Sequence, residues 1–128
     1  MRPRVTVIED NPDNRLLVEV LLENTYELTL FENGKAALEG MAEAAPDVVL
    51  LDISLPGMDG PEVLTRMRQM PELAAVPVVA LTAHAMAGDR ERYLEMGFDA
   101  YVSKPITDEK RLLSTIEDLL RRGSSATA

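Results

Sequence analysis

The stretch VVLLDISLPGMDG, residues 48–60, decides the fold class of this chain of 128 residues. Its first four residues are all apolar, which is typical of a strand buried on both faces of a parallel sheet. The run then meets Asp52 and passes into a stretch with proline and glycine, the residues of turns. A carboxylate at the end of a buried strand is costly unless it has a partner or a function. The stretch therefore predicts a central strand that places Asp52 at an edge of the core.

Similar apolar runs alternate with amphipathic stretches along the rest of the chain. This alternation is typical of the (βα)5 class of α/β folds, in which right-handed crossovers place helices on both faces of a parallel sheet. Strands are expected over residues 4–9, 26–32, 47–52, 76–82 and 99–104. Helices are expected over residues 12–24, 34–44, 60–70, 88–97 and 108–122.

Each predicted helix carries apolar residues at helical spacing, which should face the sheet. Pro61 suits the first turn of the third helix, and Gly97 suits the end of the fourth. The apolar positions are Leu16, Leu17, Val20 and Leu21; Ala37, Leu38 and Met41; Val63, Leu64 and Met67; Tyr93, Leu94 and Met96; and Leu112, Leu113, Ile116, Leu119 and Leu120.

Composition argues against several classes of function. The formal net charge of -9 disfavours a surface for nucleic acid or anionic membrane, so proteins are the expected partners. The lack of cysteine and the single histidine, His84, argue against a disulfide scaffold or a structural zinc site. The N-terminus does not resemble a signal peptide, and no segment reaches the roughly 20 apolar residues of a membrane span. The cytoplasm is therefore the expected location.

One domain is expected, because a chain of 128 residues can bury one hydrophobic core but is too short for two. We expect the domain to span residues 1–122. The remaining residues, 123–128, have the sequence GSSATA, for which we predict a disordered tail without a function.

Polar residues stand at the carboxyl ends of four predicted strands: Glu9, Asp10, Asp52, Thr82 and Lys104. Ligands of open α/β sheets bind outside these ends, near the point where the strand order reverses. In a (βα)5 fold the first and third strands are neighbours, so the three carboxylates should crowd together. Two unit charges about 4 Å apart repel each other by roughly 4 kcal/mol at an effective dielectric constant of about 20. A positive charge is therefore expected at this edge.

Magnesium is the expected cation, because Mg2+ favours carboxylates, carbonyl oxygens and water and keeps positions free for a phosphate oxygen. Lys104 adds a second positive charge, and Thr82 adds a hydroxyl donor. These groups predict a site at which a phosphoryl group attaches to Asp52 as nucleophile. The metal and Lys104 would neutralise charge, and Thr82 would donate a hydrogen bond to the product.

Three motifs together resemble the receiver domain of two-component response regulators: VIEDNPDN at residues 7–14, LLDISLPGMDG at 50–60, and VALTAHAMAGDRERYLEMGFDAYVSKPI at 79–106. The resemblance covers nearly the whole chain. The third motif is most similar to receivers of hybrid histidine kinases and to short stand-alone receivers. The resemblance implies a flavodoxin-like three-layer sandwich with a five-stranded parallel sheet in the order 2-1-3-4-5.

The resemblance also assigns roles to the residues at the sheet edge. Asp52 corresponds to the phosphoacceptor, and Glu9 and Asp10 correspond to metal-binding acids, although many family members carry Asp where Glu9 stands. The backbone carbonyl of Ser54 is implied as a further metal ligand. Thr82 and Tyr101 correspond to a switch pair.

Three further assignments follow from the resemblance. Lys104 corresponds to the lysine that contacts the phosphoryl group, and its peptide bond to Pro105 is usually cis in the family, which is compatible with the weak trans preference of bonds before proline. The side chains of Ser54 and His84 stand at positions that line the path of the attacking water, so they are expected to modulate the lifetime of the phosphorylated state.

Each of these residues also has a simpler interpretation. Asp10 alone would more often cap the following helix. Tyr101 lies on an apolar strand and could belong to the core, and His84 could be a solvated loop residue. PGMDG is a turn in either case.

The expected function is that of a single-domain response regulator, phosphorylated on Asp52 by a sensor histidine kinase or a histidine phosphotransfer protein. It would not be an enzyme, but a phosphoacceptor that assists its own phosphorylation and dephosphorylation. Phosphorylation would reshape a face made by the fourth helix, fifth strand and fifth helix, which binds a downstream protein. No output domain is expected in this chain.

Three alternatives stay open. The chain could be the receiver portion of a hybrid histidine kinase, or an adaptor that works without phosphorylation. A phosphatase of the haloacid dehalogenase type would need a second aspartate two residues after the nucleophile, where Ser54 stands.

Overall fold

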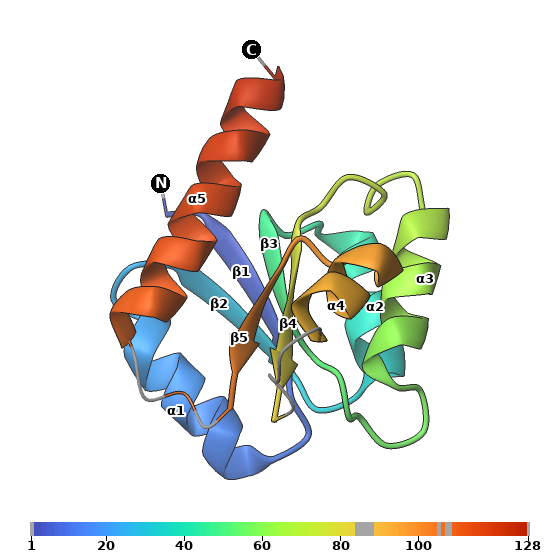
Figure 1. Ribbon diagram of the computed structural model, residues 1–128, viewed down its shortest axis with the longest axis horizontal. Coiled ribbons are helices and arrows are strands. Elements are labelled where there is room, and N and C mark those ends of the chain that lie inside the picture. Colours follow the sequence, from blue (N-terminus) through green and yellow to red (C-terminus); the bar gives the residue numbers. More distant parts are fainter. Residues whose placement is uncertain (1, 84–88, 105, 107–108, 128) are drawn as a thin grey trace.

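A parallel sheet of five strands forms the centre of the molecule, with the strands in the order β2-β1-β3-β4-β5 (Figure 1). The computed structural model describes residues 2–83, 89–104, 106 and 109–127. The predicted (βα)5 fold, its flavodoxin-like layers and its strand order are confirmed. The strands are β1 Arg4–Ile8, β2 Glu27–Phe31, β3 Val48–Asp52, β4 Val78–Thr82 and β5 Ala100–Ser103.

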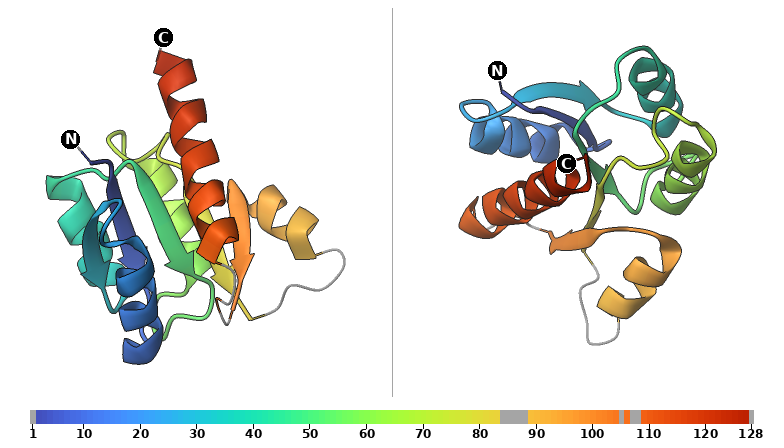
Figure 2. Two further views of the ribbon diagram at one scale, coloured as in Figure 1. Left: turned by 90° about the vertical axis from the view of Figure 1, so that its left-hand side faces the viewer. Right: turned by 90° about the horizontal axis from the view of Figure 1, so that it is seen from above.

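Helices cover both faces of the sheet and complete three layers. Helices α1 and α5 lie on one face and α2, α3 and α4 on the other, as the views in Figure 1 and Figure 2 show. The helices are α1 Pro12–Leu22, α2 Gly34–Glu43, α3 Gly60–Gln69, α4 Asp89–Met96 and α5 Glu109–Thr127.

The sheet separates two apolar clusters. Strands β3 and β4 are buried along their whole length, as their uninterrupted apolar sequences predict, and they contribute side chains to both clusters. Under α2, α3 and α4, the helices contribute Ala37, Met41, Val63, Leu64, Met67 and Tyr93. Under α1 and α5, they contribute Val18, Leu22, Leu112, Ile116 and Leu119.

Helix α1 packs through a face that matches the predicted one only in part, since the predicted residue Leu21 is partly buried against the core. Its buried residues are Val18 and Leu22, whereas Leu16, Leu17 and Val20 are 58%, 37% and 56% exposed. Both sets have helical spacing, so periodicity alone could not choose between them. The chain leaves β1 in a direction that turns Val18 and Leu22 toward the sheet. An apolar surface therefore remains uncovered on α1.

Helix α4 also buries less than predicted. Tyr93 is buried, but Leu94 and Met96 are 40% and 45% exposed. A helix of 8 residues presents one narrow side to the sheet, and Tyr93 occupies that side. Gly97 follows α4 with φ of +109°, a left-handed conformation that glycine adopts without strain, which confirms its predicted place at the helix end.

Helix α5 continues to Thr127, into the residues for which the sequence predicted a disordered tail. No proline follows Arg122 to stop the helix. The domain boundary at residue 122 stays a prediction. Among the described residues, no helix combines the length and the apolar character needed to cross a membrane.

Candidate functional site

Glu9, Asp10 and Asp52 lie together beyond the carboxyl ends of β1 and β3. Ile8 of β1 is in register with Leu51 of β3, so the acidic residues that follow them become neighbours. One carboxylate oxygen from each of the three acids lies within 4.8 Å of the others. Glu9 and Asp52 are buried, and Asp10 is exposed. The sheet therefore holds two carboxylates away from water beside a third that solvent reaches.

Lys104 provides positive charge at this cluster. Its Nζ lies 3.0 Å from Asp52 Oδ2 and 3.2 Å from Glu9 Oε2. The residue follows β5, where its backbone N–H donates to the carbonyl of Thr82 at 2.7 Å and extends the pairing of β5 with β4. The pairing of β5 with β4 thus positions the Lys104 ammonium group beside the buried carboxylates of Glu9 and Asp52.

The environment shifts two ionisation equilibria. Burial, and secondly repulsion by the Asp52 carboxylate, raise the pKa of Glu9 above its ordinary value of 4.5. Burial alone would lower the pKa of Lys104, but its hydrogen bond and charge interaction with Asp52, together with those to Glu9, outweigh burial and raise it. Lys104 is thus protonated at neutral pH, while ionised Glu9 is disfavoured relative to a solvated glutamate.

The start of α1 fixes the loop that carries Glu9 and Asp10. Asn11, rather than Asp10, is the N-cap of α1, because its side chain accepts hydrogen bonds from the N–H groups of Asp13 and Asn14. The N–H of Asn11 donates to Glu9 Oε1 at 3.1 Å. The capping interpretation of Asp10 is therefore wrong, and its carboxylate belongs to the acidic cluster.

Sequence analysis missed Arg15, which lies behind the two acids. Its Nη1 donates to the backbone carbonyls of Glu9 and Asp10, at 2.9 Å and 3.1 Å. Arg15 follows the N-cap by four residues, one helical turn, so its side chain reaches back toward β1. A long cation one turn after an acidic pair was a signal available in the sequence.

The loop after β3 holds Asp52 from its other side. The N–H of Ser54 donates to Asp52 Oδ1 at 3.0 Å, and the Ser54 residue itself is exposed. Gly60 approaches so closely that a Cβ there would lie 2.5 Å from the backbone oxygen of Asp52. Gly57 has φ of +74°, and Asp59 caps α3. The PGMDG turn thus packs backbone against Asp52, a placement that a larger residue at Gly60 would disturb.

Thr82 and Tyr101, the predicted switch pair, both contact a third residue, Tyr93, that the sequence did not connect with them. Thr82 is buried, and its Oγ1 lies 2.9 Å from the hydroxyl oxygen of Tyr93. Tyr101 is partly buried and packs against the same cluster as Tyr93, with ring centroids 6.3 Å apart. The core interpretation of Tyr101 is therefore correct in part.

Three predicted features stay predictions. His84 and Pro105 lie outside the described residues, and the proposed ligation by the Ser54 carbonyl requires a bound metal.

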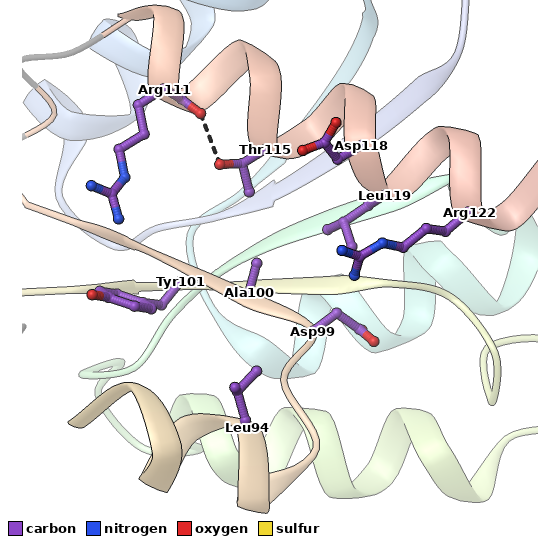
Figure 3. Close-up of a pocket in the computed structure, with 9 residues that line it drawn as sticks. All are labelled: Leu94, Asp99, Ala100, Tyr101, Arg111, Thr115, Asp118, Leu119 and Arg122. Carbon is purple, nitrogen blue, oxygen red and sulfur yellow. Dashed lines mark hydrogen bonds between the residues drawn. The ribbon is translucent and has the colours of Figure 1, made fainter. Parts of the chain in front are cut away.

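A polar groove of about 340 Å3 lies beside Tyr101, between α4, β5 and α5. Figure 3 shows Tyr101 and Ala100 of β5 between Leu94 of α4 and side chains of α5, among them Arg111 and Asp118. The guanidinium carbon of Arg111 lies 5.9 Å from the centre of the Tyr101 ring. The groove is therefore in contact with the predicted switch residue.

The donor set of the acidic cluster fits a magnesium ion. Glu9, Asp10 and Asp52 offer carboxylate oxygens, the ligands that Mg2+ prefers. The exposure of Asp10 leaves that side open to the water molecules that Mg2+ retains. These residues would hold the ion, and the negative charge of their carboxylates would attract it.

Comparison with known proteins gives consistent matches. The response regulator receiver domain family matches residues 5–117. The polar-differentiation response regulator DivK of Brucella anthropi is 41% identical over 121 residues, which cover 94% of this chain and 98% of DivK. The sensor protein GacS of Pseudomonas syringae pv. syringae is 41% identical over 112 residues, which cover 84% of this chain but only 12% of GacS.

Solved structures have the same fold. The receiver domain of a sensor histidine kinase from Pseudomonas aeruginosa, with a magnesium ion coordinated in its active site cleft, aligns with a TM-score of 0.85 at 30% identity. The alignment covers 94% of this chain and 98% of that domain.

Proposed function

Because the chain belongs to the response regulator receiver domain family, we propose that it accepts a phosphoryl group on Asp52 in two-component signal transduction. The observation that carries this proposal is the setting of the Asp52 carboxylate. One oxygen accepts from Ser54 N–H, the other lies 3.0 Å from Lys104 Nζ, and two further acids stand beside it. A buried carboxylate with this set of neighbours suits a nucleophile for an anionic group.

The donor would be a sensor histidine kinase or a histidine phosphotransfer protein. In the transfer, an oxygen of Asp52 bonds to phosphorus while the bond from phosphorus to the donor's histidine nitrogen breaks. The electron pair of that bond stays on the nitrogen, which regains a proton from solvent. Lys104 approaches the same oxygen face and would neutralise charge on the phosphoryl oxygens.

Magnesium would be held by Glu9, Asp10, Asp52 and the carbonyl of Ser54. When bound, the ion supplies positive charge that offsets the repulsion between the carboxylates and the phosphoryl oxygens. Arg15 would hold the loop bearing Glu9 and Asp10 through their backbone carbonyls. The magnesium in the related receiver from Pseudomonas aeruginosa supports this choice of ion.

The donor is expected to bind near α1. Leu16, Leu17 and Val20 form an exposed apolar surface on the helix that starts at the acidic cluster. A partner that covers this surface would bury apolar area next to Asp52. The surface supports a protein donor, and a small phosphodonor would not need it.

The output would be a change of protein-binding surface at the groove between α4, β5 and α5, which Tyr101 lines. We propose that the chain works in the cytoplasm and has no separate substrate, since it assists its own phosphorylation and dephosphorylation. The match to nearly all of DivK supports a single-domain response regulator, and the match to part of GacS supports a receiver within a hybrid kinase. The chemistry at Asp52 is the same in both.

Acetyl phosphate labelling tests the proposal. With Mg2+, intact-mass spectrometry of the wild-type protein should show one added phosphoryl group, and Asp52→Asn should show none, since an amide is a far poorer nucleophile. Asp59→Asn is the matched control, because asparagine also caps helices well and should preserve α3. Equal labelling of Asp52→Asn would place the acceptor elsewhere. An unlabelled wild-type protein would favour the phosphorylation-independent adaptor.

A further inference from the structure

Two buried hydroxyl groups from different elements share a hydrogen bond beside the site. Thr82 ends β4 and Tyr93 lies in α4, and their oxygens are 2.9 Å apart. The two residues are only 2% and 1% exposed. A hydrogen bond in such a dry environment depends on the positions of both elements, so it couples the end of β4 to α4.

The Tyr93 ring is also in contact with aromatic and basic side chains, among them Tyr101, which lines the groove. It meets Phe98 edge to face, with centroids 6.3 Å apart and planes at 87°, and it lies against Tyr101. The guanidinium of Arg92 lies over the same ring, 5.4 Å from its centre. Tyr93 thus contacts both members of the predicted switch pair, Thr82 through its hydroxyl and Tyr101 through its ring.

We propose that Tyr93 is a positioning residue whose hydroxyl stabilises the unphosphorylated arrangement of Thr82 and α4. The inference rests on the proposed function, because it requires that Thr82 turn toward a phosphoryl group on Asp52. That turn would break the bond to Tyr93 and release α4 from β4. Phosphorylation would then reach the groove through Tyr93 as well as through Tyr101.

The chemistry of the hydroxyl groups gives this coupling its direction. Phosphoryl oxygens accept hydrogen bonds and cannot donate them, so the single proton of the Thr82 hydroxyl must point toward the phosphoryl group. In the present arrangement Thr82 Oγ1 instead lies at hydrogen-bonding distance from Tyr93. As Thr82 Oγ1 moves toward the phosphoryl group its distance from Tyr93 would increase, so the bond would stabilise the unphosphorylated state more than the phosphorylated one, and such a difference shifts a conformational equilibrium.

Beryllofluoride, a stable substitute for the phosphoryl group, provides the test. Tyr93→Phe keeps the ring and removes the hydroxyl, so the variant should lose the hydrogen bond that stabilises the unliganded state of the wild-type protein. Calorimetric titration with beryllofluoride in saturating Mg2+ should then show about three- to tenfold tighter binding by the variant, as expected for one hydrogen bond. Tyr26→Phe is the matched control, because Tyr26 is buried in the cluster on the opposite face of the sheet and should bind like wild type.

A double-mutant cycle separates the hydrogen bond from packing. In a Thr82→Ala background the bond between the two hydroxyl groups is absent, so adding Tyr93→Phe should tighten beryllofluoride binding clearly less than it does in the wild-type background. Wild-type protein offers a measurement that needs no variant. Amide hydrogen exchange in residues 91–96 of α4 should speed up when beryllofluoride occupies the site, because α4 loses a tie to β4.

The outcomes are distinct. Unchanged or weaker binding by Tyr93→Phe, or the same gain in the Thr82→Ala background, overturns the role of Tyr93 and leaves the proposed function standing. An unchanged rate of amide hydrogen exchange in α4 at full beryllofluoride occupancy also overturns the role of Tyr93 and leaves the proposed function standing. This measurement needs only the wild-type protein, so it applies even if Tyr93→Phe fails to fold. A wild-type protein that does not bind beryllofluoride with Mg2+ overturns both the proposed function and this inference.

Discussion

Lys104 Nζ lies 3.0 Å from Asp52 Oδ2, so an ion pair joins the proposed phosphoacceptor to the residue that follows β5. The same ammonium group lies 3.2 Å from Glu9 Oε2. In the protein without metal, Lys104 therefore balances two buried carboxylates. Its position links the stability of the fold to the charge of the site.

Lys104→Met should destabilise the metal-free protein at neutral pH. The substitution leaves Glu9 and Asp52 without this countercharge, and removing one partner of a buried pair costs about 3 kcal/mol. Urea unfolding followed by circular dichroism measures the loss. Lys110→Met, an exposed position in α5, is the control and should change the free energy of unfolding little. Equal stability of the two variants would contradict the proposed role of the ion pair.

Magnesium should raise the melting temperature, since it binds the folded arrangement of the three acids and has no such site in the unfolded chain. The stabilisation should reach about 1.4 kcal/mol when Mg2+ stands at about ten times its Kd. Asp10→Ala should reduce this increase, whereas Asp13→Ala, an exposed acid in the first turn of α1, should retain it. An undiminished increase in Asp10→Ala would remove Asp10 from the metal site.

Glu9 should make stability depend on pH in a defined direction. Its native pKa is raised above 4.5 by burial and by Asp52, so the unfolded chain releases this proton first as pH increases. The contribution of Glu9 to stability therefore falls as pH rises from about 4.5 through its raised native pKa, and then levels off.

Glu9→Gln isolates this effect. Without Mg2+, the free energy of unfolding of wild type minus that of Glu9→Gln should decline between about pH 4.5 and the raised native pKa. Denaturant melts across this range give the difference. Glu39→Gln, an exposed position in α2, is the control for the loss of a glutamate away from the site. A difference that increases with pH would mean that Lys104 outweighs burial and Asp52 at Glu9.

Arg15 should support metal binding without being a ligand. Arg15→Met removes the donor to the carbonyls of Glu9 and Asp10, and losing such supporting contacts weakens metal affinity by about tenfold. Calorimetric titration with Mg2+ measures the change. Arg121→Met, at an exposed arginine in α5, controls for the loss of one positive charge. Matching affinities in the two variants would show that Arg15 has no specific role.

Tyr101 should move toward a more buried position when beryllofluoride and Mg2+ occupy the site. Thr82 would turn toward the added group and vacate space beside the ring. Fluorine NMR of protein labelled with 3-fluorotyrosine should show a shift of the Tyr101 signal, assigned through Tyr101→Phe, while that of Tyr26 stays in place. An unchanged Tyr101 signal at full occupancy would contradict the predicted switch. The conformational signal would then have to pass through the loops after Asp52 and Thr82.

The fold could be predicted from the sequence because apolar runs and amphipathic stretches alternate without ambiguity. The acids also followed from it, since residues after Ile8 and Leu51 must meet once β1 and β3 pair in register. The rotation of α1 did not follow. Its apolar residues occupy more positions than one face can hold, so only the packed structure shows that Val18 and Leu22 face the sheet.

Contacts between side chains were the least predictable part of the site. Periodicity placed Tyr93 on the inner side of its helix, but gave no indication that its hydroxyl meets Thr82, 11 positions earlier in the chain. The helix cap was equally open, because Asp10 and Asn11 are both residues that cap helices well. In the structure the N–H groups of Asp13 and Asn14 donate to the Asn11 side chain, so Asn11 is the N-cap.

Gly60 imposes an asymmetry on how copies of this chain can diverge after gene duplication. A side chain there would collide with the backbone of Asp52, whereas Leu16 and Val20 of α1 meet no such barrier, being more than half exposed. Descendants can therefore exchange residues on α1, and with them the proposed phosphodonor, while Asp52 keeps its place. The residues that would bind a partner on α1 can thus vary among relatives, whereas the close contact between position 60 and the Asp52 backbone requires glycine.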